Sequence, residues 1–291
     1  YEKVMDTLIG IGNVGCNVVE KMSSYPQYNI LKIDSDLREG DGVLKLEAMA
    51  SHEEYENSFP QDEAEEFLKS VTGECMVVVS GASKISGIVL RILELLGRQP
   101  LYITKLSVLY IRPDLESLVG ERRLHERLTF GVLQEYARSN LLERIYLVDN
   151  VKLEKSLGKI SIADYYEQLN NLLQSTLHFI NVFRHVDPVI NTFSPPIPTA
   201  KISTFGMVDF NDGEESLFFD LKFPREKIYY YAINNERLQE DSSLFGKIRQ
   251  QIKAKTDDKV DVSYGIYPTE YENDYVYCVY NATLVQGQNI L

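Results

Sequence analysis

Three glycines near the N-terminus have the spacing of a loop that holds phosphate. Gly10, Gly12 and Gly15 match the pattern G-x-G-x-x-G and stand between a predicted strand at residues 6–10 and a predicted helix that begins at Gly15. Glycine lets the backbone approach a phosphate closely, and the first turn of a helix offers free N–H groups and positive partial charge. The spacing predicts a nucleotide phosphate site, although a tight strand-to-helix turn without a ligand would need the same residues.

An acidic residue follows this loop at the distance typical of dinucleotide-binding folds. Asp34 stands 19 residues after Gly15, at the end of a second predicted strand at residues 28–33. Such folds place a ribose-binding carboxylate at this position. The combination indicates an NAD-dependent oxidoreductase, but no His/Asp or Tyr/Lys constellation in the sequence supports the catalysis that this function needs.

The first half of the chain alternates between predicted strands and helices. Beyond the two strands above, we expect strands at 75–79, 100–103 and 144–148, and helices at 60–70, 86–96 and 121–139. This alternation predicts an α/β fold, with a parallel sheet and helices on both of its faces. The last helix carries an apolar stripe that we expect to face the core, formed by Leu124, Leu128, Val132 and Tyr136.

The pattern of elements changes after the longest predicted helix, at residues 161–186. Ser161 and Asp164 are suited to its N-terminus, and Asp187-Pro188 ends it. Beyond a proline-rich linker we expect strands at 202–210, 216–223, 227–233, 260–267 and 275–284, and a helix at 244–255. The predicted organisation is a nucleotide-binding domain over 1–160, a central helix over 161–186 and a smaller α+β domain over 187–291.

Composition excludes several classes of protein. The 291 residues carry a net charge of −13, which argues against direct nucleic-acid binding because that affinity depends largely on Lys and Arg. Three distant cysteines, Cys16, Cys75 and Cys278, form neither a disulfide framework nor a metal motif. No apolar run is long enough to span a membrane and no signal peptide is visible, so we expect a cytoplasmic protein.

Several segments resemble the tubulin/FtsZ family in the same order along the chain. Residues 9–19 are similar, without a gap, to the family's first nucleotide loop, I-G-V-G-G-G-G-G-N-A-V, and Asn17 falls on its asparagine. Residues 148–158 resemble I-P-N-D-K-L-L-K-V-L-G, and residues 160–166 resemble I-S-L-L-D-A-F, where the family's central helix begins. Shorter similarities are those of residues 102–105 to V-V-T-K and of residues 120–123 to G-K-K-R.

The resemblance implies a binding site for GTP or GDP. It assigns phosphate contacts in the first loop to Gly10, Gly12, Asn13, Gly15, Cys16 and Asn17. It assigns phosphate contacts in a second loop to Ser83, Ser86 and Gly87. Arg123 would lie near the ribose or the terminal phosphates, and Asn150 and Asp164 would read guanine. Simpler roles are a solvated helix charge for Arg123, a strand end for Asn150 and a first-turn helix acid for Asp164.

Two phosphate-binding segments depart from the family pattern. The family's second loop, G-G-G-T-G-T-G, is replaced at residues 80–87, where Ala82 and Ile85 lack the conformational freedom of glycine. Residues 39–66, which include the expected surroundings of the terminal phosphate, contain ten acids and one lysine, a net charge of −9. Such carboxylates would repel a triphosphate unless a cation such as Mg²⁺ intervened.

A third departure concerns hydrolysis. In the family, the loop N-V-D-F-A-D of a neighbouring subunit brings two acids to the terminal phosphate. Residues 185–190 keep the first acid as Asp187, but Ile190 replaces the second. We therefore expect a divergent GTP-binding relative, similar to phage- and plasmid-encoded members, that stacks head to tail into filaments and hydrolyses GTP weakly. The alternatives are a non-hydrolysing structural or regulatory relative of the same fold and the NAD-dependent oxidoreductase.

Overall fold

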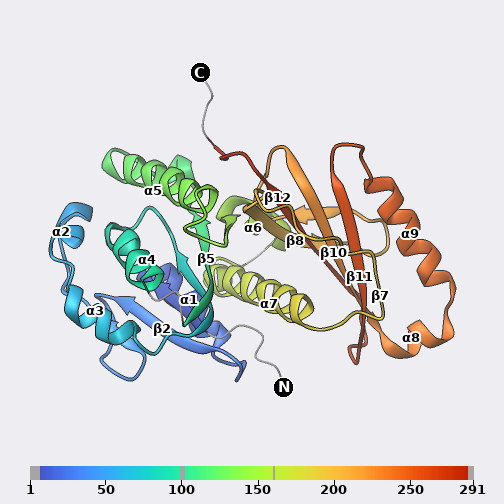
Figure 1. Cartoon of the computed structure of the whole chain (residues 1–291), viewed down its shortest axis with the longest axis horizontal. Helices are drawn as coiled ribbons and strands as arrows, with labels where there is room; N and C mark the ends of the chain where they lie inside the picture. The colour runs from blue at the N-terminus through green and yellow to red at the C-terminus, as the bar shows by residue number, and fades with distance from the viewer. Residues whose placement is uncertain (1–6, 99–101, 160, 288–291) are drawn as a thin grey trace.

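Six parallel strands form the sheet of the N-terminal half. The computed structural model describes residues 7–98, 102–159 and 161–287, and Figure 1 shows their arrangement. The strand order β3-β2-β1-β4-β5-β6 places β1 and β4 side by side. The bounds are Thr7–Ile11 for β1, Asn29–Asp34 for β2, Val43–Lys45 for β3, Gly73–Val79 for β4, Ile103–Arg112 for β5 and Arg144–Asp149 for β6. Because these strands are parallel, their carboxyl ends lie at one edge of the sheet.

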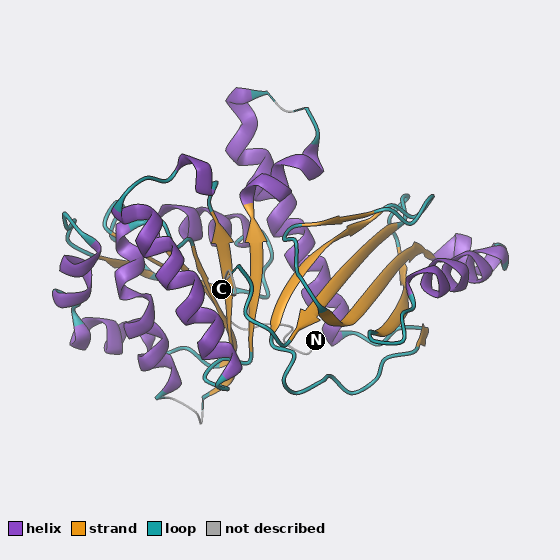
Figure 2. Ribbon diagram, turned by 90° about the horizontal axis from the view of Figure 1, so that it is seen from above, coloured by secondary structure: helices purple, strands orange, loops and turns teal. Residues whose placement is uncertain are grey.

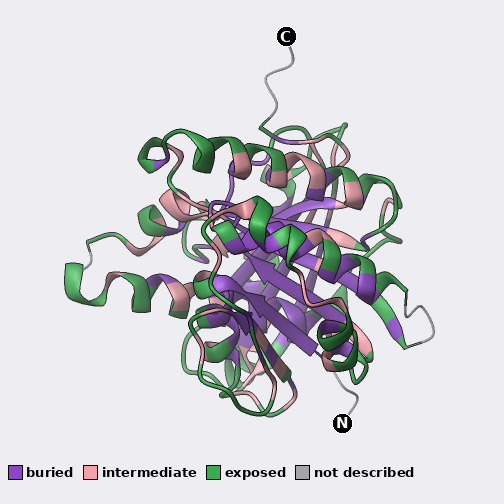
Figure 3. Ribbon diagram, turned by 90° about the vertical axis from the view of Figure 1, so that its left-hand side faces the viewer, coloured by how far each residue is buried: buried purple, intermediate pink, exposed green. Residues whose placement is uncertain are grey.

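Helices cover both faces of this sheet. One face packs against α1 (Gly12–Met22) and α7 (Tyr165–His185), and the other against α3 (Gln61–Leu68), α4 (Val89–Gly97) and α5 (Glu121–Arg138). Successive strand residues point to opposite faces, so Leu8 packs in the first layer and Ile9 in the second. Figure 3 shows buried strands between helices whose outer surfaces are exposed. The shorter helices of this half are the α-helices α2 (His52–Asn57) and α6 (Asn150–Leu157) and the 3-10 helices η1 (Lys84–Ile88), η2 (Leu115–Ser117) and η3 (Ile162–Asp164).

The C-terminal half continues the sheet with mostly antiparallel strands. A short parallel pairing of Ile145 with Ile202 and of Tyr146 with Ser203 connects β6 to β8. The order then runs β8-β12-β10-β11-β7, with β9 paired to β8, and α7 lies between the two sets of strands (Figure 2). The bounds are Ile190–Asn191 for β7, Ile202–Val208 for β8, Glu215–Leu217 for β9, Pro224–Asn234 for β10, Asp261–Thr269 for β11, Tyr275–Ala282 for β12, Asn235–Glu240 for α8 and Ser243–Lys255 for α9.

The α/β fold class predicted from the sequence is confirmed, but several elements differ. The strand expected at 100–103 is instead the ten-residue β5, Ile103–Arg112, while Pro100 and Leu101 lie outside the described residues, as do Asp6 and Ile160. Polar residues early in β5 concealed it: Lys105 forms an ion pair with Glu74 on β4, at 3.3 Å. Most of the strand expected at 216–223 is not extended, although its Phe218 is buried. Within the described residues, no helix has the length and apolar character needed to cross a membrane.

The predicted core-facing stripe of α5 is wrong in its first half, whereas Tyr136 near its end does pack against the core. Leu124 and Leu128 are 54% and 55% exposed, and the helix buries Phe130, Leu133 and Ala137 instead. That face also carries Glu126, whose charge made it look solvent-facing in the sequence. The structure satisfies Glu126 through its Oε1 atom, which accepts hydrogen bonds from the Tyr110 hydroxyl and from Arg112 Nε, each at 3.0 Å. Pairing to distant residues therefore reversed the orientation expected from hydrophobicity.

Candidate nucleotide-binding site

Two loops meet at the carboxyl edge of the parallel strands. The first leads from β1 into α1, and the second leads from β4 through η1 into α4. A Cβ atom at Gly12 would lie 2.9 Å from Ile85 Cγ2 and 3.7 Å from the Ser83 hydroxyl oxygen. The structure thus places Gly12 and Ser83 beside each other, as a phosphate site shared by both loops requires.

The first loop leaves the N-terminus of α1 open. The helix begins at Gly12, whose φ is +76°, a value that a residue with a side chain rarely adopts. No side chain caps the first N–H groups, and the first turn contains no acidic residue. The N–H groups and the helix dipole therefore favour an anion at this position.

The other two glycines of the first loop are required by packing. A Cβ atom at Gly15 would lie 2.2 Å from the Val78 carbonyl oxygen, and one at Gly10 would lie 2.6 Å from the Gly15 carbonyl oxygen. These glycines let α1 pack directly against β1 and β4. Close packing explains Gly10 and Gly15 without any ligand, but it does not explain the open end of the helix.

The polar side chains of α1 point in different directions. Asn13 and Asn17 are exposed, and Asn17 Nδ2 donates to Asn13 Oδ1 at 3.4 Å. Cys16 is buried, its Sγ lies 3.4 Å from the Gly10 carbonyl oxygen, and burial raises the pKa of its thiol to about 12. Cys16 can therefore offer a ligand its backbone N–H, whereas the two asparagines also offer their side chains.

The second loop is more enclosed than the first. The Ser86 hydroxyl is buried and donates to the Gly81 carbonyl oxygen at 3.3 Å. Gly87 packs against α2, because a Cβ atom there would lie 2.4 Å from the His52 carbonyl oxygen. Ser83 precedes η1 without capping it, and it is the predicted second-loop residue found beside Gly12.

The sequence did not identify three residues that border the second loop. Arg122 and the predicted Arg123 are both exposed, but it is Arg122 whose Nε donates to the Ala82 carbonyl oxygen, at 3.5 Å. The His52 and His125 rings stack with centroids 4.3 Å apart, and burial together with His125 lowers the pKa of His52. No local signal in the sequence distinguishes Arg122 from Arg123 or joins two histidines so far apart.

The predicted guanine-reading residues lie near the start of α6 and of α7. Asn150 directly follows β6, and the preceding Asp149 accepts a hydrogen bond from the Val151 N–H at 2.8 Å. Asp164 is exposed at the beginning of α7, where its side chain makes no capping hydrogen bond. The Tyr165 hydroxyl donates to Glu154 at 2.8 Å and so links the two helices. Asp149, rather than Asn150, caps α6, and Asp164 does not cap α7. The side chains of both predicted residues are therefore not used in helix capping.

The environment of Asp34 does not favour the oxidoreductase alternative. Asp34 is 8% exposed, and its Oδ1 accepts a hydrogen bond from the Ser35 N–H at 2.8 Å. Burial, the largest influence, raises the pKa of its carboxyl. β3 pairs with β2 at this point, and the Leu46 N–H donates to the Asp34 carbonyl oxygen at 3.0 Å. The Asp34 carboxylate is therefore nearly buried and already hydrogen-bonded within the chain, which leaves little of it accessible to a ribose.

Asp187 lies at the opposite end of α7 from Asp164. The 21 residues of α7 span about 30 Å, so Asp187 cannot reach a nucleotide bound by the first loop of its own chain. It is exposed and borders a cavity of about 460 Å³ that Arg144 and Arg184 also line. Ile190, at the position of the family's second acid, begins β7 and pairs with Ile266. A strand residue therefore occupies that position.

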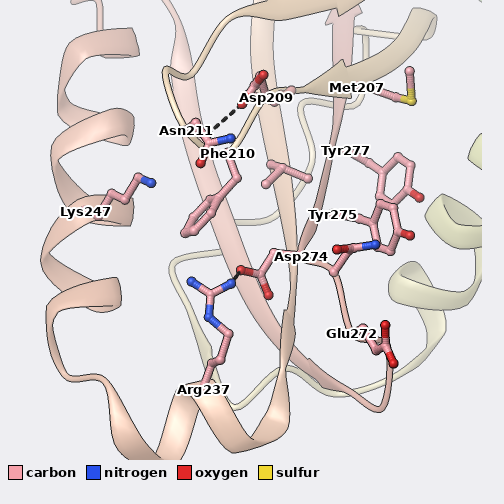
Figure 4. Close-up of a pocket in the computed structure, with 13 residues that line it drawn as sticks. Met207, Asp209, Phe210, Asn211, Arg237, Lys247, Glu272, Asp274, Tyr275 and Tyr277 are labelled. Carbon is pink, nitrogen blue, oxygen red and sulfur yellow. Dashed lines mark hydrogen bonds and ion pairs between the residues drawn. The ribbon is translucent and has the colours of Figure 1, made fainter.

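A separate cavity of about 420 Å³ lies in the C-terminal half (Figure 4). Arg237 forms an ion pair with Asp274, whose Oδ1 also accepts a hydrogen bond from the Asn234 N–H at 3.0 Å. Lys247 lies over the Phe210 ring, 4.3 Å from its centroid. These contacts connect α8 to the residue that precedes β12 and α9 to the segment that follows β8, so they support a structural role for the charged groups.

Comparison with known proteins identifies the fold. No protein-family model matches the sequence, and neither does any curated protein. Among solved structures, an FtsZ W319Y mutant from M. jannaschii is similar at 12% identity and a TM-score of 0.69, over 98% of this chain and 92% of that one. A GTPγS-form protofilament of TubZ from Bacillus thuringiensis serovar israelensis has 14% identity and a TM-score of 0.73, over 96% and 87%. CetZ from Methanosaeta thermophila has 16% identity and a TM-score of 0.71, over 96% and 86%.

These similarities cover nearly the whole chain, across both halves of the sheet and α7. They define a tubulin-like fold. The chain has the fold of the tubulin/FtsZ superfamily, and the family resemblance found in its sequence is confirmed at the level of the fold.

Proposed function

We propose that this chain binds GTP and GDP and assembles head to tail into filaments, with weak GTP hydrolysis. The observation that carries the proposal is the open N-terminus of α1, which begins at Gly12 beside Ser83 within a tubulin/FtsZ fold. Packing explains the neighbouring glycines, but an uncapped helix end at the carboxyl edge of a parallel sheet is suited to phosphate.

The nucleotide would lie across this edge of the sheet. Its phosphates would accept hydrogen bonds from the N–H groups of the first loop and from the Ser83 hydroxyl, with Arg122 supplying positive charge nearby. Asn150 and Asp164 would bind guanine, because a carboxylate accepts hydrogen bonds from the N–H groups of that base. When present, Mg²⁺ would screen the phosphates from the carboxylates of residues 39–66.

Exposed apolar residues at the two ends of α7 support head-to-tail assembly. Ile162 and Tyr166 are 95% and 75% exposed near its N-terminus, and Val189 and Ile190 are exposed beyond its C-terminus. Exposed apolar clusters are typical of interaction surfaces, and a contact between different ends need not close on itself, so it can build an open filament. In such a filament, Asp187 of one subunit would approach the nucleotide of the next. The TubZ structure similar to this chain is itself a protofilament.

Ligand-dependent thermal unfolding tests nucleotide binding. Ligand at about 100 times its Kd stabilises a protein by about 2.7 kcal/mol, so GTP and GDP should each raise the Tm while NAD should not. A rise with NAD alone would support the oxidoreductase, and no rise with any of the three would contradict nucleotide binding.

Light scattering and electron microscopy with GTP and Mg²⁺ test assembly. Ile162→Asp should abolish filaments but preserve the rise in Tm with GTP, because the substitution changes an exposed apolar contact outside the proposed phosphate site. Phe223→Asp is a matched control, because it places the same charge at an exposed aromatic residue away from both ends of α7. Filaments of undiminished amount from Ile162→Asp would contradict this contact.

The enclosed second loop favours one alternative, a structural relative that binds nucleotide without hydrolysing it. Ile85 and the buried Ser86 occupy a loop that the family fills with glycines. Phosphate release by the assembled protein distinguishes the two functions. Release that Asp187→Ala abolishes would support the weak GTPase, and no release above background would support the structural relative.

A further inference from the structure

The outward face of α5 has features of a docking surface. Leu124 and Leu128 lie one turn apart and more than half exposed, and Arg123 and Arg127 are exposed beside them. In Figure 1, α5 lies at the outer edge of the parallel half. In the described part of the chain, the opposite side of α5 makes the contacts with the core. Exposed leucines flanked by arginines favour an acidic partner that has an apolar centre.

The same chain contains a groove with these complementary properties. A cavity of about 350 Å³ lies between the end of β3 and α3. Its apolar lining is formed by Leu46, Met49, Tyr55 and Pro60. Glu47 and Glu63 supply two carboxylates against the single cation of Lys45, and Ser58 completes the lining. The groove belongs to residues 39–66, which carry most of the net negative charge. It therefore offers both an apolar floor and acidic groups.

We propose that the exposed face of α5 docks into this groove of a second copy of the chain. The leucines would fill the apolar lining, and Arg123 and Arg127 would approach Glu47 and Glu63. Two copies with a net charge of −13 repel each other at long range, so a local match of opposite charges would select this orientation. The contact is side to side, uses neither end of α7 and does not require nucleotide, so it extends beyond the proposed head-to-tail assembly.

Exchange of charges between the two surfaces tests the contact. Sedimentation equilibrium without nucleotide, in an Ile162→Asp background that removes the head-to-tail contact, measures side-to-side association alone. Arg127→Glu and Glu63→Arg should each weaken association by about tenfold or more, because each places like charges together. The double variant, and an equimolar mixture of the two single variants, should restore association because opposite charges face each other again.

Two controls separate this contact from general effects. Lys253→Glu makes the same charge change as Arg127→Glu on the exposed surface of α9 and should leave association unchanged. Leu128→Asp should abolish association without lowering the Tm, because the side chain is exposed. A chain that remains monomeric in this background, or single variants that the mixture fails to rescue, would overturn the proposal and leave α5 to an acidic protein of another kind. Loss of nucleotide binding would not affect this measurement, so the two proposals can fail independently.

Discussion

The first and second loops lie at the same edge of the same sheet but differ in how they are built. The first combines glycines, a positive φ at Gly12 and an uncapped helix. The second replaces glycines with side chains, buries Ser86 and is covered by α2 through His52. The parallel strands position both loops, but the local residues decide how much open backbone each presents to a ligand.

This difference separates two requirements that a glycine-rich loop usually meets together. Gly10 and Gly15 serve close packing, and Gly12 serves backbone geometry at the candidate phosphate site. In the second loop, Ser83 stays beside Gly12, while Ser86 and Gly87 make contacts within the protein. We therefore expect substitutions in the two loops to affect stability and nucleotide affinity in different proportions.

The largest effect is expected at Gly15, where packing is tightest. Gly15→Ala should lower the free energy of unfolding by about 3 kcal/mol, because a Cβ atom 2.2 Å from the Val78 carbonyl oxygen forces α1 away from β4. Urea denaturation measures the change. Gly246→Ala, in α9, is the control: a Cβ atom there meets open space, and alanine should raise stability by about 0.5–1 kcal/mol. Equal stability of Gly15→Ala and the unmodified chain would contradict the packing argument.

Acidification should lower the free energy of unfolding through His178, which packs against the segment that follows α1. His178 on α7 stacks on Tyr25, and its Nδ1 lies 2.8 Å from the Tyr28 hydroxyl oxygen, in the segment that follows α1. Burial lowers the pKa of His178 to about 4, from an ordinary value of 6.5. His178 thus binds a proton more tightly in the unfolded chain than in the folded one. Its protonation therefore leaves the free energy of unfolding unchanged well above pH 6.5 and lowers it as the pH decreases from 6.5 toward 4. Between pH 7.5 and 5 we expect a loss of about 2 kcal/mol from this group.

Urea denaturation at several pH values measures this dependence. His178→Gln should remove most of it, because glutamine does not titrate, although the variant starts from a lower stability. His52, beside the second loop, also has a lowered pKa and acts in the same direction, so His52→Gln shows how much the second loop contributes. A pH dependence that His178→Gln leaves unchanged would show that other groups are responsible.

A substitution at Gly12 should change both stability and nucleotide binding, because Gly12 in the first loop lies against Ile85 in the second. Gly12→Ala should cost about 1 kcal/mol of stability because of its positive φ, and it should abolish the rise in Tm with GTP, because the new Cβ atom displaces Ile85 and narrows the site. Gly213→Ala is matched in backbone geometry, with a φ of +78°, but lies at the β8–β9 turn. Gly213→Ala should lower stability by a similar amount and keep the rise in Tm with GTP. Full GTP binding by Gly12→Ala would locate the phosphates elsewhere.

The smallest effect is expected within the second loop. Ser83→Ala should lower GTP affinity by about fivefold, the loss of one hydrogen bond worth about 1 kcal/mol, and should change stability little. Ser86→Ala should lower stability and change GTP affinity little, because the Ser86 hydroxyl donates to the Gly81 carbonyl oxygen within the protein. Fluorescent-nucleotide titration together with urea denaturation resolves the two effects. If the two variants had the same profile, the distinction between Ser83 and Ser86 would be lost.

Prediction from the sequence succeeded where one segment contains the whole signal. The position of the first loop and the extents of α5 and α9 follow from glycine spacing and hydrophobic periodicity, which are local properties, although α1 begins at Gly12 and not at the predicted Gly15. It failed where a polar residue has a distant partner. Lys105 pairs with Glu74 and concealed β5, and Glu126 pairs with Tyr110 and Arg112 and concealed the buried face of α5. Arg122 was missed because its partner, the Ala82 carbonyl oxygen, lies 40 residues away in the sequence.

The sequence by itself determined the class of fold and the position of the first loop. Alternating strands and helices require a parallel sheet, and Gly10, Gly12 and Gly15 permit a tight entry into a helix. Only the tertiary structure decided which second-loop residue borders Gly12 and which face of α5 is buried. Those outcomes depend on contacts between residues far apart in the chain, where burial of a charge is favourable only once its partner is in place.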